Sequence, residues 1–195
     1  MAIIHKTTMN PGKLELLAAW LPAQPWYLPT GSAPDLARAG GFRLDDPEGE
    51  VGIEFMVVTD SSGGLPTAYH VPVTYRGAPL EGADAGLIGT SEHGELGLRW
   101  VYDGPHDPVL VERLHALFRG LAEPQAQSLS DTPDPTVTAR YEGSRVPGSV
   151  DGPALTVVRV LRDTAAAGHL GEVTAGWTHP DGTARRGVFA SLDAR

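Results

Sequence analysis

The sequence predicts an α+β protein built on antiparallel β-sheet, with flanking helices and a C-terminal β-meander. Three observations carry this prediction. Helical and strand-like segments follow one another without the regular alternation of βαβ units. Residues 50–76 have the hydrophobic alternation of a β-hairpin. The part of the chain after residue 135 carries strand signals alone.

A first helix is expected from Pro11 to Leu21. Asn10 is a suitable N-cap, and proline is well tolerated at the first helical position. Leucines then recur on one helical face. The helix is expected to end at Leu21, because Pro22 cannot continue it.

Loop and hairpin signals follow this helix. Residues 29–49 are rich in Gly, Pro, Ser and Asp, and predict mostly loop with a short helical turn at 34–39. Alternating apolar residues then predict strands at 50–60 and 67–76, joined by a Ser-Ser-Gly-Gly turn. Pro72 lies in the second strand and predicts a sheet edge or a β-bulge there, because proline has no N–H to donate.

A third strand and a second helix follow. The strand is expected at 97–103 and the helix at 108–120. Asp107 repeats the signal of a cap followed by proline, leucines again share one face, and Gly120 marks the stop.

Residues 122–135 are polar and punctuated by prolines, which predicts a linker. The expected organisation is therefore an α+β region at 1–121, this linker, and an antiparallel β region at 136–195. The Asp-Gly pair in the His-Pro-Asp-Gly segment 179–182 predicts a hairpin turn. Strands of the last region are expected at 136–143, 155–162, 169–178 and 183–192.

The stretch Trp20-Leu21-x-x-Gln24-x-Trp26-Tyr27 follows the first helix. This motif, followed in order by the hairpin, the third strand and the second helix, resembles the N-terminal cap of actinobacterial maltokinases and related aminosugar kinases. The resemblance covers roughly residues 10–120. It implies a cap-like, cystatin-like fold for the first region, in which a curved antiparallel sheet carries flanking helices.

The chain is more similar still to short, stand-alone actinobacterial proteins with this cap, some of which are labelled 1,4-alpha-glucan branching proteins. Neither kinase nor branching activity is expected from it. A kinase needs a strand lysine and a catalytic-loop aspartate. Lys6 and Lys13 both precede the motif, and about 75 residues follow position 120, too few for the kinase lobes. A branching enzyme needs a (β/α)₈ domain of about 250 residues.

Composition excludes further classes. The chain has no cysteine, which rules out disulfides, thiolate metal sites and cysteine nucleophiles. Its formal net charge of −9 argues against nucleic acid as a partner. No apolar run approaches the roughly 20 residues of a membrane span, and the N-terminal segment lacks the apolar core of a signal peptide. A cytoplasmic protein without membrane contact is expected.

Trp20, Trp26 and Tyr27 are the candidate interaction residues. Their rings could stack on a sugar or on a partner protein. The interpretation we favour is that they close one end of the hydrophobic core, with the neighbouring prolines fixing the loop. The resemblance agrees, since in the kinases these positions belong to the cap and not to the active site.

Other polar clusters have simpler interpretations than catalysis or metal binding. Asp103, His106 and Asp107 lie around a turn, with Asp107 as a helix N-cap. The segment 91–95 holds a histidine between two glutamates and is typical of an exposed turn. His70 is expected as a partly buried strand residue. We therefore predict no catalytic residue, no cofactor and no metal site.

Three functions of different class stay open at this point. The first is a non-catalytic interaction or regulatory module with a protein partner in trehalose, maltose or glycogen metabolism, because the chain resembles a kinase cap without a kinase. The second is a binding protein that holds a sugar or sugar phosphate on the concave face of the sheet. The third is an enzyme of unrecognised type. A homo-oligomer is a further option, since unpaired edge strands invite pairing.

Overall fold

The computed structural model describes residues 8–129, 131–163 and 168–194. An antiparallel sheet dominates this part of the chain, which confirms the antiparallel prediction. The α-helices are short: α1 (Lys13–Trp20) and α2 (Pro108–Phe118). The strands are β1 (Met9–Asn10), β2 (Leu36–Leu44), β3 (Gly52–Asp60), β4 (Thr67–Arg76), β5 (Leu87–His93), β6 (Gly97–Asp103), β7 (Gln125–Ala126), β8 (Thr138–Tyr141), β9 (Ala154–Val157), β10 (Gly171–Thr178) and β11 (Ala184–Asp193).

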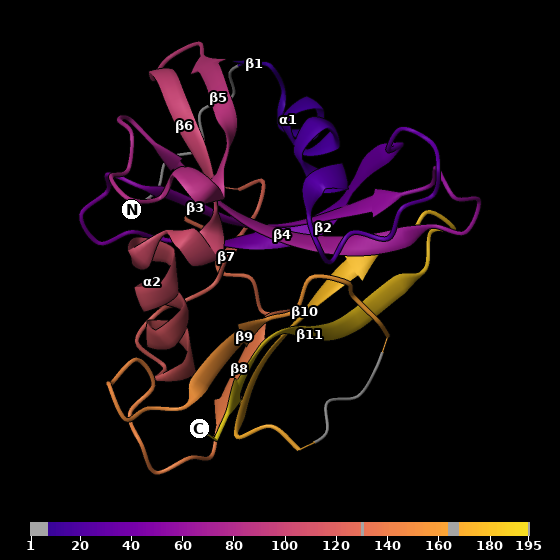
Figure 1. Ribbon diagram of the computed structural model, residues 1–195. Helices are drawn as coiled ribbons and strands as arrows, with labels where there is room; N and C mark the ends of the chain where they lie inside the picture. The colour runs from indigo at the N-terminus through magenta and orange to yellow at the C-terminus, as the bar shows by residue number, and fades with distance from the viewer. Residues whose placement is uncertain (1–7, 130, 164–167, 195) are drawn as a thin grey trace.

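The strands form one sheet with the order β1-β5-β6-β4-β3-β2-β10-β11-β9, while β7 pairs with β2 and β8 with β10. The C-terminal strands therefore join the sheet of the first region. β2 and β10 meet at one pair, Gly40 with Trp177. The sheet folds over at this junction, so that β8 to β11 lie below β2 to β4 in Figure 1, with α1 above and α2 at the lower left.

Strand alternation divides the buried side chains between two cores. Phe55 and Val57 of β3 face the larger core, which α2 and the C-terminal strands complete. Met56 and Val58 point to the opposite face and pack in a second core beneath α1. Both faces of β3 are therefore covered, which explains its long run of buried apolar residues.

The segment 158–161 connects the two layers a second time. The His70 N–H donates to the Arg159 carbonyl (2.8 Å), and the Leu161 N–H donates to the Ala68 carbonyl (2.9 Å). On its other side, the Val158 N–H donates to the Phe189 carbonyl of β11 (2.9 Å). This segment thus covers the edge of β4 near its start and ties it to β11.

The prediction for residues 29–49 is wrong where it concerns β2. Residues 36–44 form a strand, and no helical turn occupies 34–39. Gly40 and Gly41 break the usual strand pattern, yet the geometry requires glycine. Gly41 has φ +130°, and a Cβ there would lie 2.2 Å from the carbonyl oxygen of Phe55. The glycines allow close approach between strands and do not mark a loop.

Both predicted helices are present, with corrections at their ends. α1 begins after an N-cap at Gly12 instead of Asn10, because Asn10 pairs with β5 as part of β1. The Gly12 N–H donates to Glu15 Oε2 (2.6 Å), the one bond of a capping box that a glycine cap can make. α1 ends at Trp20 and continues as a 3₁₀ turn, Leu21–Ala23. α2 begins after the predicted cap, Asp107.

The predicted hairpin is confirmed as β3 and β4, and the third strand as β6. β4 is nevertheless not an edge strand, since it pairs with β3 and with β6. Pairing with β6 begins at Val73, and the 158–161 segment covers β4 near His70. Pro72 lies between β6 and the 158–161 segment. On this side of β4, away from β3, no partner there requires an N–H donor. The expectation of an edge thus holds for this position alone.

The C-terminal strands overlap their four predicted segments. The predicted turn at 179–182 is confirmed by the bond from the His179 N–H to the Thr183 carbonyl (2.9 Å). β7 lies within the predicted linker and pairs with β2, and the larger core contains residues from both sides of that linker. Neither helix described here has the length and apolar composition that a membrane crossing requires.

Candidate functional site

The aromatic motif packs against β4. The Tyr27 ring stacks on Tyr69 with centroids 5.4 Å apart, and the Trp26 ring lies 6.1 Å from Tyr69. Trp20 meets Trp26 edge-on at 5.7 Å. Tyr27 is buried, and its hydroxyl donates to Asp60 (2.7 Å). Burial and this carboxylate raise the pKa of Tyr27 to about 12. The tryptophans are partly buried against the second core.

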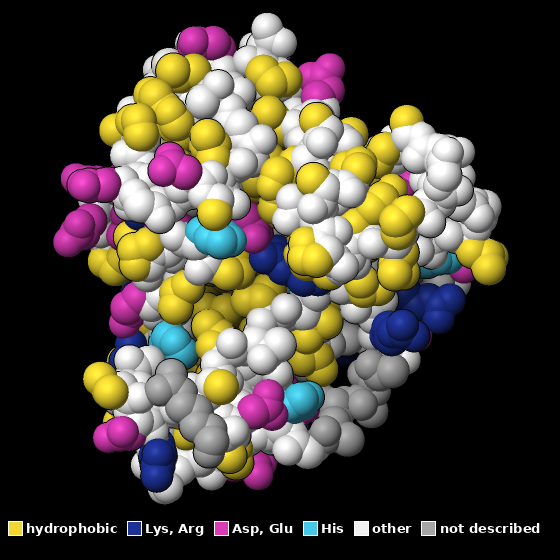
Figure 2. All heavy atoms as spheres, viewed as in Figure 1, with side chains coloured by type: hydrophobic (Ala, Val, Ile, Leu, Met, Phe, Trp, Pro, Cys, Tyr) yellow, Lys and Arg dark blue, Asp and Glu magenta, His cyan; other side chains and the backbone are white. Residues whose placement is uncertain are grey.

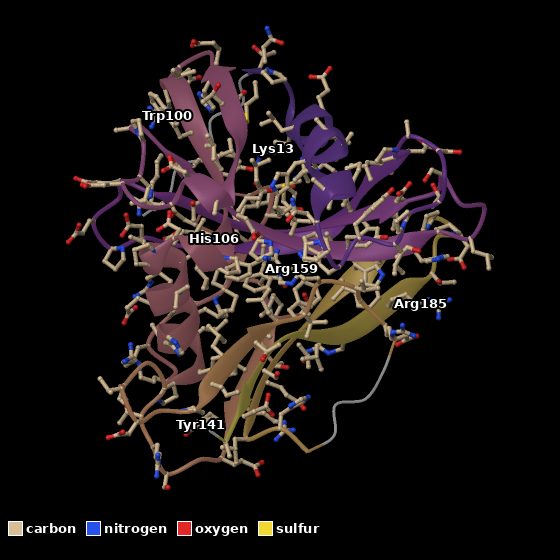
Figure 3. All side chains as sticks on the ribbon, in the orientation of Figure 1. Lys13, Trp100, His106, Tyr141, Arg159 and Arg185 are labelled. Atoms are coloured by element: carbon tan, nitrogen blue, oxygen red, sulfur yellow. The ribbon has the colours of Figure 1, made fainter. Side chains whose placement is uncertain are left out.

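Arg159 links this cluster to the segment 158–161. Its guanidinium lies 4.9 Å from the Trp26 ring centroid, and its Nη2 donates to Asp103 (2.6 Å). Figure 2 shows basic side chains at the centre of this face, where Figure 3 places Arg159, between hydrophobic surfaces. The cluster thus contacts the protein itself and holds the 158–161 segment against β4.

Replacing Trp26 by alanine is expected to lower the free energy of unfolding by roughly 3 kcal/mol, the low end of the range for core tryptophans, because Trp26 is partly exposed. Urea denaturation measures the loss. Leu28→Ala, at a neighbouring side chain that is half exposed, is the control and is expected to cost less than about 1 kcal/mol. A Trp26→Ala protein as stable as the parent would contradict the structural role and return this ring to the list of binding candidates.

A buried carboxylate lies between α1 and the sheet. Glu54 Oε2 accepts from Lys13 Nζ (2.5 Å) and from the Tyr75 hydroxyl (2.7 Å), while Oε1 accepts from Gln127 (2.8 Å). Burial acts to raise the pKa of Glu54, but Lys13, the Tyr75 hydroxyl and Arg38 together outweigh it, and the net shift is downward. This cluster joins four segments of the chain, and both carboxylate oxygens of Glu54 already accept hydrogen bonds. Lys13 therefore serves the fold, while Lys6 lies outside the described residues.

The acidic residues around the turn before α2 are also engaged in the fold. Asp107 accepts from the Val109 N–H (3.0 Å), from Thr74 (2.7 Å) and from two nitrogens of Arg76 (2.7 Å each). Asp103 pairs with Arg159, and His106 Nε2 lies 4.0 Å from Asp103 Oδ2. Across the described ranges, no group of three or more His, Asp or Glu side chains is arranged to hold a metal ion.

The remaining candidate histidines, His93 and His70, lie in strands β5 and β4. Residues 91–93 end strand β5, so the expectation of an exposed turn holds only for the residues after them. Ser91 is buried and donates to the Pro11 carbonyl (2.7 Å). His70 is fully buried between Phe55 and Phe189, with Nδ1 2.9 Å from the Val158 carbonyl. Its burial is more complete than predicted.

The β5–β6 hairpin projects from the rest of the molecule (Figure 1). Val101 faces α1 and the second core, so Leu98 and Trp100 lie on the opposite face by alternation. Leu87 joins them from β5, and Leu87 and Leu98 are 37% and 39% exposed. Figure 2 shows hydrophobic side chains over this hairpin, where Figure 3 places Trp100. We call this surface the hairpin face.

A pocket of about 310 Å³ lies where the first region meets the C-terminal strands. Residues 66–68 at the start of β4 and residues 160–163 form part of its wall, together with Leu28, Trp177 and Arg185 among others. Leu28 directly follows the aromatic motif, and its N–H donates to the Tyr69 hydroxyl (3.1 Å). The aromatic motif and the 158–161 segment therefore position two walls of this pocket.

Charged side chains at the pocket are paired with one another. Arg185 Nη1 lies 3.0 Å from Asp163, and Nη2 lies 3.8 Å from Asp181. His179 Nδ1 lies 3.1 Å from Asp181. Hydrogen bonds from Thr183 hold the pKa of Asp181 at about 2, so this carboxylate is charged at neutral pH. Figure 3 places Arg185 at the right margin, where Figure 2 shows grouped basic side chains.

Sequence reasoning missed this pocket. Its residues come from widely separated parts of the chain, between Leu28 and Arg185, and form no motif of their own. The one signal nearby was the aromatic motif, which ends immediately before Leu28.

The aromatic motif, the hairpin and the cap of α2 agree in order with a known domain. Residues 20–107 match the family model of the maltokinase N-terminal cap domain. This cap segment runs from the first tryptophan of the motif to the N-cap of α2, so the resemblance is confirmed over that span. In maltokinase this domain is the non-catalytic N-terminal part. No curated protein matches the chain.

Proposed function

We propose that this chain is a non-catalytic interaction module that works in the cytoplasm and binds a protein of maltose, trehalose or glycogen metabolism. The cap segment supports the metabolic context. The hairpin face supports the binding role, because a projecting apolar surface is typical of a contact site. In this proposal the cap segment has the curved, cystatin-like sheet that the resemblance implies, and 122–135 divides it from a C-terminal region.

The bonds of the polar clusters support a role without chemistry. Glu54, Asp103 and Asp107 each pair with a basic side chain that fixes the fold. These ion pairs give each of the three carboxylates a structural role that needs no substrate.

The edge of the hairpin adds a second contact mode. In the described part of the chain, β1 pairs with β5 at residues 92 and 93. Residues 87–91 therefore have an outer edge that no described strand covers, and such an edge can accept a strand from another chain. Pairing with a second copy would use the same edge.

The test is capture of partners by the immobilised protein from a cell lysate of its source, with identification by mass spectrometry. We expect an enzyme acting on maltose, trehalose or glycogen to be retained and to be lost with Leu98→Asp, because the charge disrupts the hairpin face. Leu121→Asp is the matched control, since Leu121 is exposed but lies away from the hairpin. Equal retention by parent and Leu98→Asp, or retention of no such enzyme, would contradict the proposal.

A further inference from the structure

We propose that the pocket between β4, the 160–163 segment and β10 binds an uncharged, polyhydroxylated small molecule of about monosaccharide size. This goes beyond the proposed function, because the pocket and the hairpin face are different surfaces. Trp100 and Arg185 mark them on opposite sides of the view in Figure 3.

The size and walls of the pocket fit a small ring. Its volume of about 310 Å³ is near the lower limit for small-molecule sites, roughly 300–1,000 Å³. Leu28, Val160 and Leu161 contribute apolar surface that can pack against the C–H groups of a ring. Apolar walls with a few convergent polar groups are typical of ligand sites.

The charges select against an ionic ligand. Arg162, Arg185 and Asp163 lie in the wall, and Asp181, outside the wall, pairs with Arg185, so the formal charge of these four side chains is zero. Arg185 is already paired with both carboxylates. An incoming phosphate would have to approach those carboxylates, and an ammonium group would have to approach the guanidinium groups. An uncharged ligand avoids both costs.

The hydrogen-bonding groups suit hydroxyls. Asp163 can accept a hydrogen bond and Arg185 can donate one, and a hydroxyl group does both. Trp177 also lines the pocket and contributes ring surface against which the C–H groups of such a ligand can pack.

The experiment measures binding of glucose, maltose, trehalose and myo-inositol by calorimetry, with saturable thermal stabilisation as the second readout. Glucose 1-phosphate is the anionic comparison. The pocket variant is Asp163→Ala/Arg185→Ala, which removes both members of the ion pair. Its matched control is Glu112→Ala/Arg119→Ala, which removes an ion pair of 2.6 Å on α2.

We expect at least one neutral probe to bind the parent and the control equally and the pocket variant at least tenfold more weakly. Binding of glucose 1-phosphate alone, equal affinity in the pocket variant, or binding of no neutral probe would each overturn the proposal. Leu98→Asp should keep its sugar affinity, so failure of the hairpin proposal and failure of this one give different results.

Discussion

A chain that stops at residue 128 is expected not to fold. The larger core is completed by side chains of β10 and β11, among them Trp177, Phe189 and Leu192. Loss of a large core side chain costs about 2–5 kcal/mol. Loss of several removes much of the roughly 5–15 kcal/mol that stabilises a typical domain. The fragment should show no cooperative thermal transition by circular dichroism and a poorly dispersed NMR spectrum.

A reassembly experiment provides the control. Residues 132–195 added to the 1–128 fragment should restore the cooperative transition, because the break falls outside the described strands. A 1–128 fragment that unfolds cooperatively by itself would show that the cap segment does not depend on the C-terminal strands for its core.

Acidification from pH 7 to pH 5 is expected to cost about 2 kcal/mol of stability through His70 alone. Burial lowers the pKa of His70 from 6.5 to about 3. Between these values the unfolded chain binds a proton that the folded protein does not, so stability falls as pH falls. The hydrogen bond to the Val158 carbonyl offsets part of this lowering, whereas the positive charge of Arg159 lowers the pKa of His70 further.

The comparison is between the parent and His70→Gln in urea at several pH values. Glutamine cannot gain this proton but keeps a donor for the Val158 carbonyl. We expect the stability of the variant to depend less steeply on pH between 7 and 5, whatever its absolute stability. Parallel pH profiles would contradict the assignment, as would titration of His70 near pH 6.5 in the folded protein by NMR.

Local signals predicted most of the elements. Alternation identified β3 and β4, and Asp107 with its proline identified the start of α2, because caps and strand periodicity act over a few residues. β2 was missed since Gly40 and Gly41 serve an approach between strands that is visible only in three dimensions. Asn10 was predicted to be the N-cap of the first helix, because its pairing with β5 depends on residues far along the chain.

The candidate site was predicted far less well than the fold. The aromatic motif was singled out from the sequence, but the pocket beside it depends on residues 160–163 reaching β4. That approach is made by backbone hydrogen bonds, which leave no pattern in the side chains. The hairpin face was missed because β5 has few strand-forming residues. Its pairing with β6 identifies it as a strand only in the structure.

The pairing of residue 40 with residue 177 also has a consequence for biosynthesis. Contacts between such distant parts of a chain form slowly, because a long loop must close before they contribute. On the ribosome, β2 to β4 are made long before β10 and β11, and one apolar face of the sheet stays uncovered during that interval. The nascent chain is therefore expected to depend on chaperones until its last strands emerge.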